Sequence, residues 1–87
     1  MTTKRILHLT LLKKWFDKIA SGEKREEYRD KKPYWEKRLI GKTFDEIWFR
    51  NGYSKNAPFM RVEWKGLRVD EDNYAILLGK VLEIKYV

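Results

Sequence analysis

The strongest constraint on the fold is a series of short stretches in which apolar and polar residues alternate. The clearest stretch covers residues 59–66, where almost every second residue is apolar. A period of two predicts a strand with one face in the core. The same pattern predicts a strand over residues 6–11, where Leu7, Leu9 and Leu11 share one face. We expect further strands over residues 24–30, 44–50, 74–78 and 81–87. A small domain of many short strands avoids exposed sheet edges best when its sheet closes into a barrel. We therefore expect a mostly β (α+β) fold with a small barrel of five to six strands.

Two helices complete the expected fold of a single domain over residues 1–87. The first covers about nine residues, with Thr10 as N-cap and Ser21-Gly22 as its end. Its apolar face consists of Leu11, Leu12, Trp15, Phe16 and Ile19, of which Trp15 and Phe16 are expected to anchor the core. The second is a short helix that begins at Pro33 and ends near Gly41.

The C-terminal part is expected to contain an acidic connection and then two strands. The connection covers residues 67–73, and the two strands flank Gly79-Lys80. In the last strand we expect Leu82, Ile84 and Tyr86 to face the core.

An almost wholly charged segment, residues 21–30, follows the first helix. If it is extended, Glu27 and Arg29 share one face with Arg25, while Tyr28 lies on the other face. An acid and a guanidinium two residues apart can orient each other by a charge-assisted hydrogen bond, and Lys24 beside them is placed to meet an anion or a polar ligand. The alternative is a solvated edge strand held by surface ion pairs.

Gly22, Lys24, Glu27 and Arg29 match the G-x-K-x-x-E-x-R motif of the ASCH domains, a branch of the PUA-like superfamily. The resemblance extends over the preceding residues 6–20. It implies a pseudo-barrel with helices at its mouth, in which the motif residues gather around a cleft. PUA-like domains commonly bind RNA or modified nucleotides, so the resemblance implies such a ligand here.

Other candidate ligand-binding residues lie outside the motif. Arg50, Asn51 and Tyr53 combine a cation, an amide and a ring in one polar loop, and the resemblance places this loop near the charged segment. Trp35 lies among basic residues, a combination that suits base stacking beside phosphates. The alternative for Trp35 is that it covers the end of the barrel.

Two function classes follow from the same residues. In a binding domain, Lys24, Arg29 and Arg50 would meet a phosphate or a carbonyl edge, and Glu27 would hold Arg29 or accept from a base. In a hydrolase, Lys24 and Glu27 would form the catalytic acid–base pair.

Some ASCH-type members use the motif lysine to activate a threonine that deacylates an acetylated cytidine nucleoside, and others have been described as ribonucleases. Glu27 stands here where the deacylating members carry that threonine. For their later catalytic glutamate, Glu63 is the strand carboxylate that we nominate. A third possibility is a basic face that contacts a protein partner.

Composition narrows these classes. The chain has no cysteine and one histidine, which excludes disulfides and makes a metal site improbable, and we expect no cofactor. No apolar run reaches the ~18 residues of a membrane span, so we expect a cytoplasmic protein without a signal peptide. Residues 1–42 hold thirteen Lys and Arg against six Asp and Glu, and therefore carry the whole net charge of +7. Such a charge attracts nucleic acid or nucleotides, although it also serves solubility.

Overall fold

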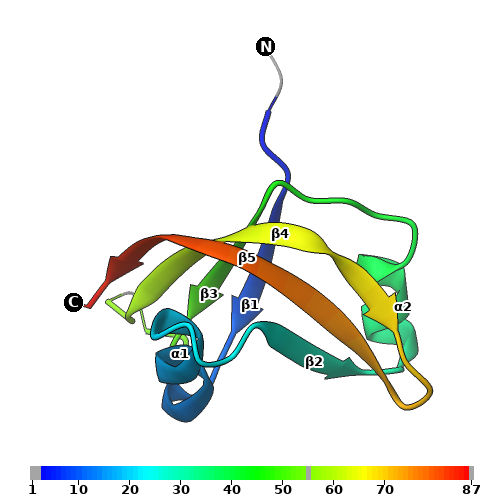
Figure 1. Cartoon of the computed structure of the whole chain (residues 1–87), viewed down its shortest axis with the longest axis horizontal. Helices are drawn as coiled ribbons and strands as arrows, with labels where there is room; N and C mark the ends of the chain where they lie inside the picture. Colours follow the sequence, from blue (N-terminus) through cyan, green and yellow to red (C-terminus); the bar gives the residue numbers. More distant parts are fainter. Residues whose placement is uncertain (1–2, 55, 87) are drawn as a thin grey trace.

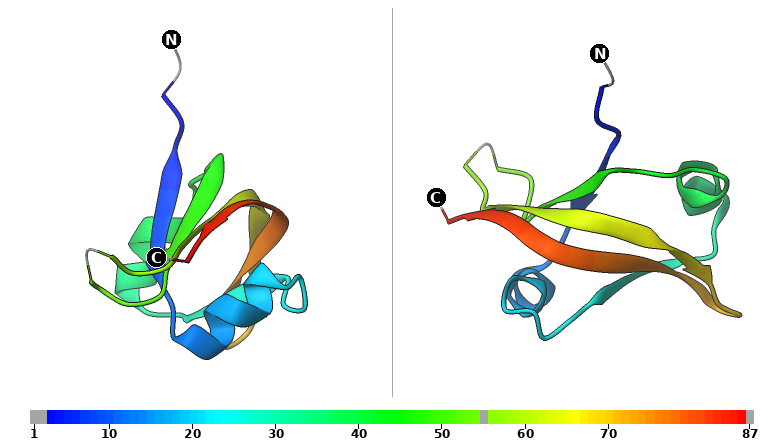
Figure 2. Two further views of the ribbon diagram at one scale, coloured as in Figure 1. Left: turned by 90° about the vertical axis from the view of Figure 1, so that its left-hand side faces the viewer. Right: turned by 45° about the horizontal axis from the view of Figure 1, so that its top comes forward.

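The computed structural model describes residues 3–54 and 56–86, and within them it contains five strands and two helices. In chain order these are β1 (Ile6–Thr10), α1 (Lys13–Ala20), β2 (Glu26–Asp30), α2 (Pro33–Leu39), β3 (Glu46–Arg50), β4 (Phe59–Val69) and β5 (Asn73–Lys85). The strands form one sheet in the order β1-β3-β4-β5-β2, in which β1 and β3 are parallel and the other pairs antiparallel. The sheet curls into a half-barrel (Figure 2), which confirms the predicted small, mostly β, barrel-like fold.

The two outer strands of the curled sheet are β1 and β2, and they face each other across its opening. The short strand β2 runs along this opening, with α1 near its first residue and α2 beyond its last (Figure 1). Side chains at the opening are therefore contributed by segments far apart in the sequence.

The core lies inside the curl and is closed by the two helices. The apolar faces predicted for residues 6–11 and 59–66 lie on the core, where Trp64 is only partly buried. From α1, Phe16 and Ile19 point into the core, and from α2, Leu39 does so. The remaining fully buried large side chains are Ile47, Phe49, Met60, Val62 and Ile76.

The start of the first helix differs from the prediction. Leu11, the residue after β1, is still held against β3, because its N–H donates to the backbone oxygen of Arg50 at 2.7 Å. The helix therefore begins only after Leu12, which occupies the N-cap position in place of Thr10. Leu12 does not join the apolar face and is 74% exposed.

The predicted end of the first helix and the predicted start of the second agree with the structure. The residue after Ser21 is Gly22, whose φ of +83° is a left-handed conformation that glycine adopts without a Cβ clash. The N–H of Lys24 then donates to the oxygen of Lys18, which turns the chain directly into β2. Pro33 is the first residue of α2, as its fixed φ favours.

The C-terminal prediction was wrong in three respects. Strand β4 continues to Val69, so the connection shrinks to the turn at residues 70–72, and β5 is one continuous strand. The ladder between β4 and β5 shifts register around Val62, which pairs with Val81. The shift breaks the alternation at Leu82, so that Val81 and Ile84 both pack on the core while Leu82 is exposed. Tyr86 lies beyond the end of β5 and is exposed, although its ring meets that of Phe16 edge-on.

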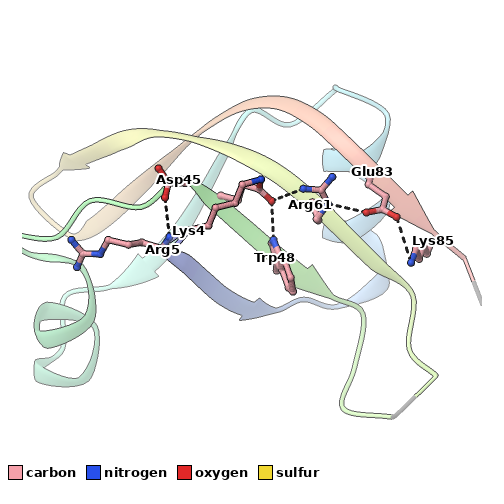
Figure 3. Close-up of polar contacts among 8 residues, drawn as sticks. Lys4, Arg5, Asp45, Trp48, Arg61, Glu83 and Lys85 are labelled. Carbon is pink, nitrogen blue, oxygen red and sulfur yellow. Dashed lines mark hydrogen bonds and ion pairs between the residues drawn. The ribbon is translucent and has the colours of Figure 1, made fainter. Parts of the chain in front are cut away.

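The outer face of the sheet carries an ion network around the buried carboxylate of Glu46. Its oxygens accept hydrogen bonds from Lys4 at 2.7 Å, Arg61 at 2.7 Å and Trp48 Nε1 at 3.0 Å. Arg61 continues the network to Glu83, as Figure 3 shows. The hydrogen bonds from Lys4, then Trp48 and Arg61, lower the pKa of Glu46 from 4.5 to about 2.

Candidate functional site: a basic, aromatic cleft at the opening of the sheet

A cleft of about 910 Å³ lies at the opening between β1 and β2. Five segments of the chain contribute to it: the end of β1 with the residues that follow, the first helix, the charged strand, the second helix and the loop after β3. Its lining residues are His8, Leu9, Thr10, Leu11, Leu12, Trp15, Lys24, Glu27, Tyr28, Arg29, Tyr34, Trp35 and Tyr53.

The floor of the cleft is built on Glu27, a carboxylate that is only 5% exposed. Lys24 Nζ lies 3.1 Å from Glu27 Oε1, and Arg29 Nη1 lies 2.6 Å from Oε2. Both carboxylate oxygens are thus paired with cations of the same segment, as expected for an acid and a guanidinium on one strand face. Arg25 departs from this face: it is exposed and lines a neighbouring hollow.

Lys24 is held between two aromatic rings as well as by Glu27. Its ammonium lies 4.8 Å from the ring centre of Trp15 and 4.7 Å from that of Tyr28. A carboxylate and two ring faces all attract a cation. The ammonium is therefore fixed in position with most of its side chain shielded from water.

The ring of Tyr28 is fixed in turn by the opposite face of β2. Its hydroxyl donates to Glu26 Oε1 at 2.8 Å, and Arg68 binds the same carboxylate through two nitrogens. The hydrogen bonds from Arg68 and then Tyr28 lower the pKa of Glu26, and the carboxylate raises the pKa of Tyr28. This surface network sets one wall of the cleft.

Arg29 joins the two outer strands of the sheet. Besides Glu27, its guanidinium donates to the backbone oxygen of Tyr28 at 2.7 Å and to that of Thr10 at 3.4 Å. It also lies 5.1 Å from the ring centre of Trp35. Because Trp35 also packs against the core, it both covers one end of the sheet and lines the cleft.

Exposed rings and an exposed leucine form the rim. Tyr34 and Tyr53 stand well out into solvent, and Tyr53 is 91% exposed. Tyr28 and Leu12 are the other large, exposed side chains at the cleft. Apolar groups exposed together around a recess are typical of a binding site rather than of a bare surface.

The structure brings together five of the seven ligand-binding residues that the sequence suggested: Lys24, Glu27, Arg29, Trp35 and Tyr53. The other two lie outside the cleft lining. Asn51 holds a cleft-lining segment in place, because its Nδ2 donates to the backbone oxygen of Leu11 at 3.1 Å. Arg50 is an exposed residue at the end of β3.

Glu63, nominated for a catalytic role, also lies outside the cleft lining. Its Oε1 accepts the backbone N–H of Lys80 at 2.9 Å, across the irregular part of the β4–β5 ladder. Its contact is therefore with the backbone of the sheet.

Sequence reasoning missed several cleft residues. Trp15 was predicted as a core anchor, and it is only partly buried and lines the cleft with its ring against Lys24. Tyr28 and Tyr34 were visible as rings among charges, but their distance from the motif lysine depends on the curl of the sheet. The residues around Thr10 line the cleft because they lie at the edge of the sheet. Their side-chain types gave no indication of this position.

The described part of the chain contains neither a candidate metal site nor a helix that could span a membrane. Within residues 3–54 and 56–86, no group of three or more His, Asp or Glu side chains is arranged to hold a metal ion. Neither of the two helices described is long and apolar enough to cross a membrane.

Known protein families, curated proteins and solved structures gave no match to this chain. The chemistry of the cleft is therefore the basis for assigning a function.

Proposed function

We propose that this chain is an ASCH-type, PUA-like domain that binds RNA or a nucleotide, modified or unmodified, in the cleft at the opening of its sheet. The observation that carries the proposal is the pairing of Lys24 and Arg29 on one buried carboxylate, at the floor of an aromatic-rimmed cleft. Two cations against one carboxylate leave one positive charge in excess. Three of the four motif residues of the ASCH resemblance, Lys24, Glu27 and Arg29, line this cleft.

The polar floor favours ligand groups that accept hydrogen bonds. Both oxygens of Glu27 already face cations of the protein, whereas Lys24 and Arg29 carry further N–H groups. A phosphate or a base carbonyl meets this pattern, because both supply acceptor oxygens. The role of Glu27 in this proposal is to hold the two cations rather than to contact a base amino group.

The rim favours a ligand with flat rings. Exposed Tyr34 and Tyr53 offer ring faces beside the cations, and bases stack on such faces with little dependence on sequence. The excess positive charge of residues 1–42 acts in the same direction over a longer range. Stacking and charge together describe a nucleic-acid or nucleotide ligand better than a protein surface.

Hydrolysis by Lys24 and Glu27 is the second candidate, and the 3.1 Å between them is the observation that favours it. However, the partners of Lys24 all attract a cation, whereas a general base needs a free lone pair. Formation of a product from RNA or from an acylated cytidine nucleoside separates this candidate from binding.

The proposal is tested by measuring the affinity for fluorescent single-stranded RNA at low salt, with Lys24→Met compared with Lys80→Met. Methionine keeps the apolar stem that packs between the rings and removes the charge. We expect Lys24→Met to weaken binding about tenfold or more, as losing a charged hydrogen bond predicts, and to reduce the salt slope by about 0.7. Lys80 is an exposed cation of β5 outside the cleft, so its variant is expected to bind like the unmodified protein.

Two results contradict the proposal. One is that the unmodified protein shows no affinity for RNA or for nucleotides at low salt. The other is that a folded Lys24→Met protein, checked by its melting curve, binds as tightly as Lys80→Met.

A further inference from the structure

Two smaller hollows adjoin the cleft, one towards each end of β2. The first has a volume of about 510 Å³ and is lined by Trp15, Lys18, Glu23, Lys24, Arg25, Glu26 and Tyr28. The second has a volume of about 390 Å³ and is lined by Pro33, Tyr34, Lys37 and Arg38. Because the first shares Trp15, Lys24 and Tyr28 with the cleft and the second shares Tyr34, each hollow adjoins the cleft, and we call the three together the row.

The row follows the length of β2. The helix α1 lies near the beginning of β2 and α2 near its opposite end (Figures 1 and 2). The first hollow is lined from α1 to the beginning of β2, whereas the second is lined by residues of α2. Five residues of strand extend about 17 Å, at 3.3–3.4 Å per residue. A single nucleotide in the cleft leaves the two flanking hollows without a ligand group.

Each section of the row carries a pair of cations. Lys18 and Arg25 line the first hollow, Lys24 and Arg29 lie at the cleft floor, and Lys37 and Arg38 line the second hollow. Of the three carboxylates in the row, Glu27 is paired with Lys24 and Arg29 and Glu26 with Arg68, which leaves Glu23 of the first hollow against the cations Lys18 and Arg25. The row therefore presents a repeated positive charge.

Aromatic rings stand where one section meets the next. Trp15 and Tyr28 separate the first hollow from the cleft, and Tyr34 separates the cleft from the second hollow. The guanidinium of Arg38 lies 4.5 Å from the ring centre of Tyr34, so cation and ring occur together there too. Alternating rings and cations along a groove match the alternating bases and phosphates of a single strand.

We infer that the cleft and its two flanking hollows form one binding track along β2 for single-stranded RNA. This inference rests on the proposed function and makes it more specific, because the ligand becomes a strand of several nucleotides and not a free nucleotide. Phosphates lie against the three cation pairs, and bases stack on the rings between them.

The test compares two probes, a nucleoside monophosphate and a single-stranded RNA of about ten nucleotides, a length within the ~4–16 covered by comparable small domains. The variant is Lys37→Ala/Arg38→Ala, which removes the cations of the second hollow and leaves the cleft floor intact. Its control is Lys42→Ala/Lys80→Ala, which removes the same charge from exposed positions outside the row.

We expect the Lys37→Ala/Arg38→Ala protein to bind the RNA at least about tenfold more weakly than the control, with a salt slope lower by about 1.4 for two phosphate contacts. Its affinity for the monophosphate is expected to equal that of the control. The inference is overturned if the monophosphate binds as tightly as the RNA, or if the two double variants bind the RNA equally. Failure of both probes to bind the unmodified protein overturns the proposed function itself, and the track with it.

Discussion

Arg29 and Thr10 connect the two outer strands of the sheet, since the guanidinium of Arg29 on β2 donates to the backbone oxygen of Thr10 on β1 at 3.4 Å. The two residues are nineteen positions apart, with α1 between them. The same guanidinium is fixed by Glu27 at 2.6 Å. The strand edges therefore approach each other at the floor of the cleft, where the proposed ligand groups gather.

Glu27→Gln tests whether the buried carboxylate holds this floor together. The amide keeps the shape of the side chain but removes the counter-charge of Lys24 and Arg29. Breaking a buried ion pair by removing one partner costs about 3–5 kcal/mol, so we expect the free energy of unfolding to fall by that order. Urea denaturation measures the loss.

The matched control is Glu83→Gln, which neutralises a more exposed carboxylate of the outer network. We expect a change of at most about 1 kcal/mol there, as for surface ion pairs. Equal effects of the two variants would show that the pairs of Glu27 add little to stability.

Tyr53→Ala tests the contribution of the rim to ligand binding. Tyr53 is 91% exposed, so its removal is expected to change the free energy of unfolding by less than about 0.5 kcal/mol. If a base stacks on its ring, affinity for single-stranded RNA falls by about 1–3 kcal/mol. Titration with fluorescent RNA measures the difference, and Tyr86→Ala, which removes an exposed ring outside the cleft, is the control. An unchanged affinity for Tyr53→Ala would exclude this ring from the binding surface.

The pKa of Glu46 predicts an acid-dependent loss of stability. Its pKa is about 2 in the folded protein, against an ordinary value of 4.5. The unfolded chain therefore takes up the proton first as the pH falls, and the stabilisation present above about pH 4.5 is lost progressively towards pH 2.

Urea denaturation at a series of pH values measures this dependence. Glu46→Gln is expected to lower stability at neutral pH and to flatten the curve between pH 4.5 and 2, because the amide does not titrate. Asp72→Asn, at an exposed turn position, is expected to leave the curve unchanged. Parallel curves for Glu46→Gln and the unmodified protein would contradict the assignment of this window to Glu46.

Local patterns in the sequence were sufficient for most of the elements. Alternation placed the buried faces of β1 and β4, because a strand turns each successive side chain to the opposite face. Gly22 and Pro33 marked a helix end and a helix start through their backbone preferences, which do not depend on distant contacts. The pairing of Glu27 with Arg29 was likewise predictable, since two residues apart on a strand is already a neighbouring position.

Tertiary structure alone decided which residues of β5 face the core and which residues form the walls of the cleft. The register shift near Val62 moved Leu82 to the surface, because pairing between strands, and not the sequence of either, determines where a bulge lies. Trp15 and Tyr34 meet at one cleft only because the sheet curls and brings α1, β2 and α2 around the end of β1. Curvature is a property of all five strands together, so the sequence of the charged segment determined the floor of the cleft but not its walls.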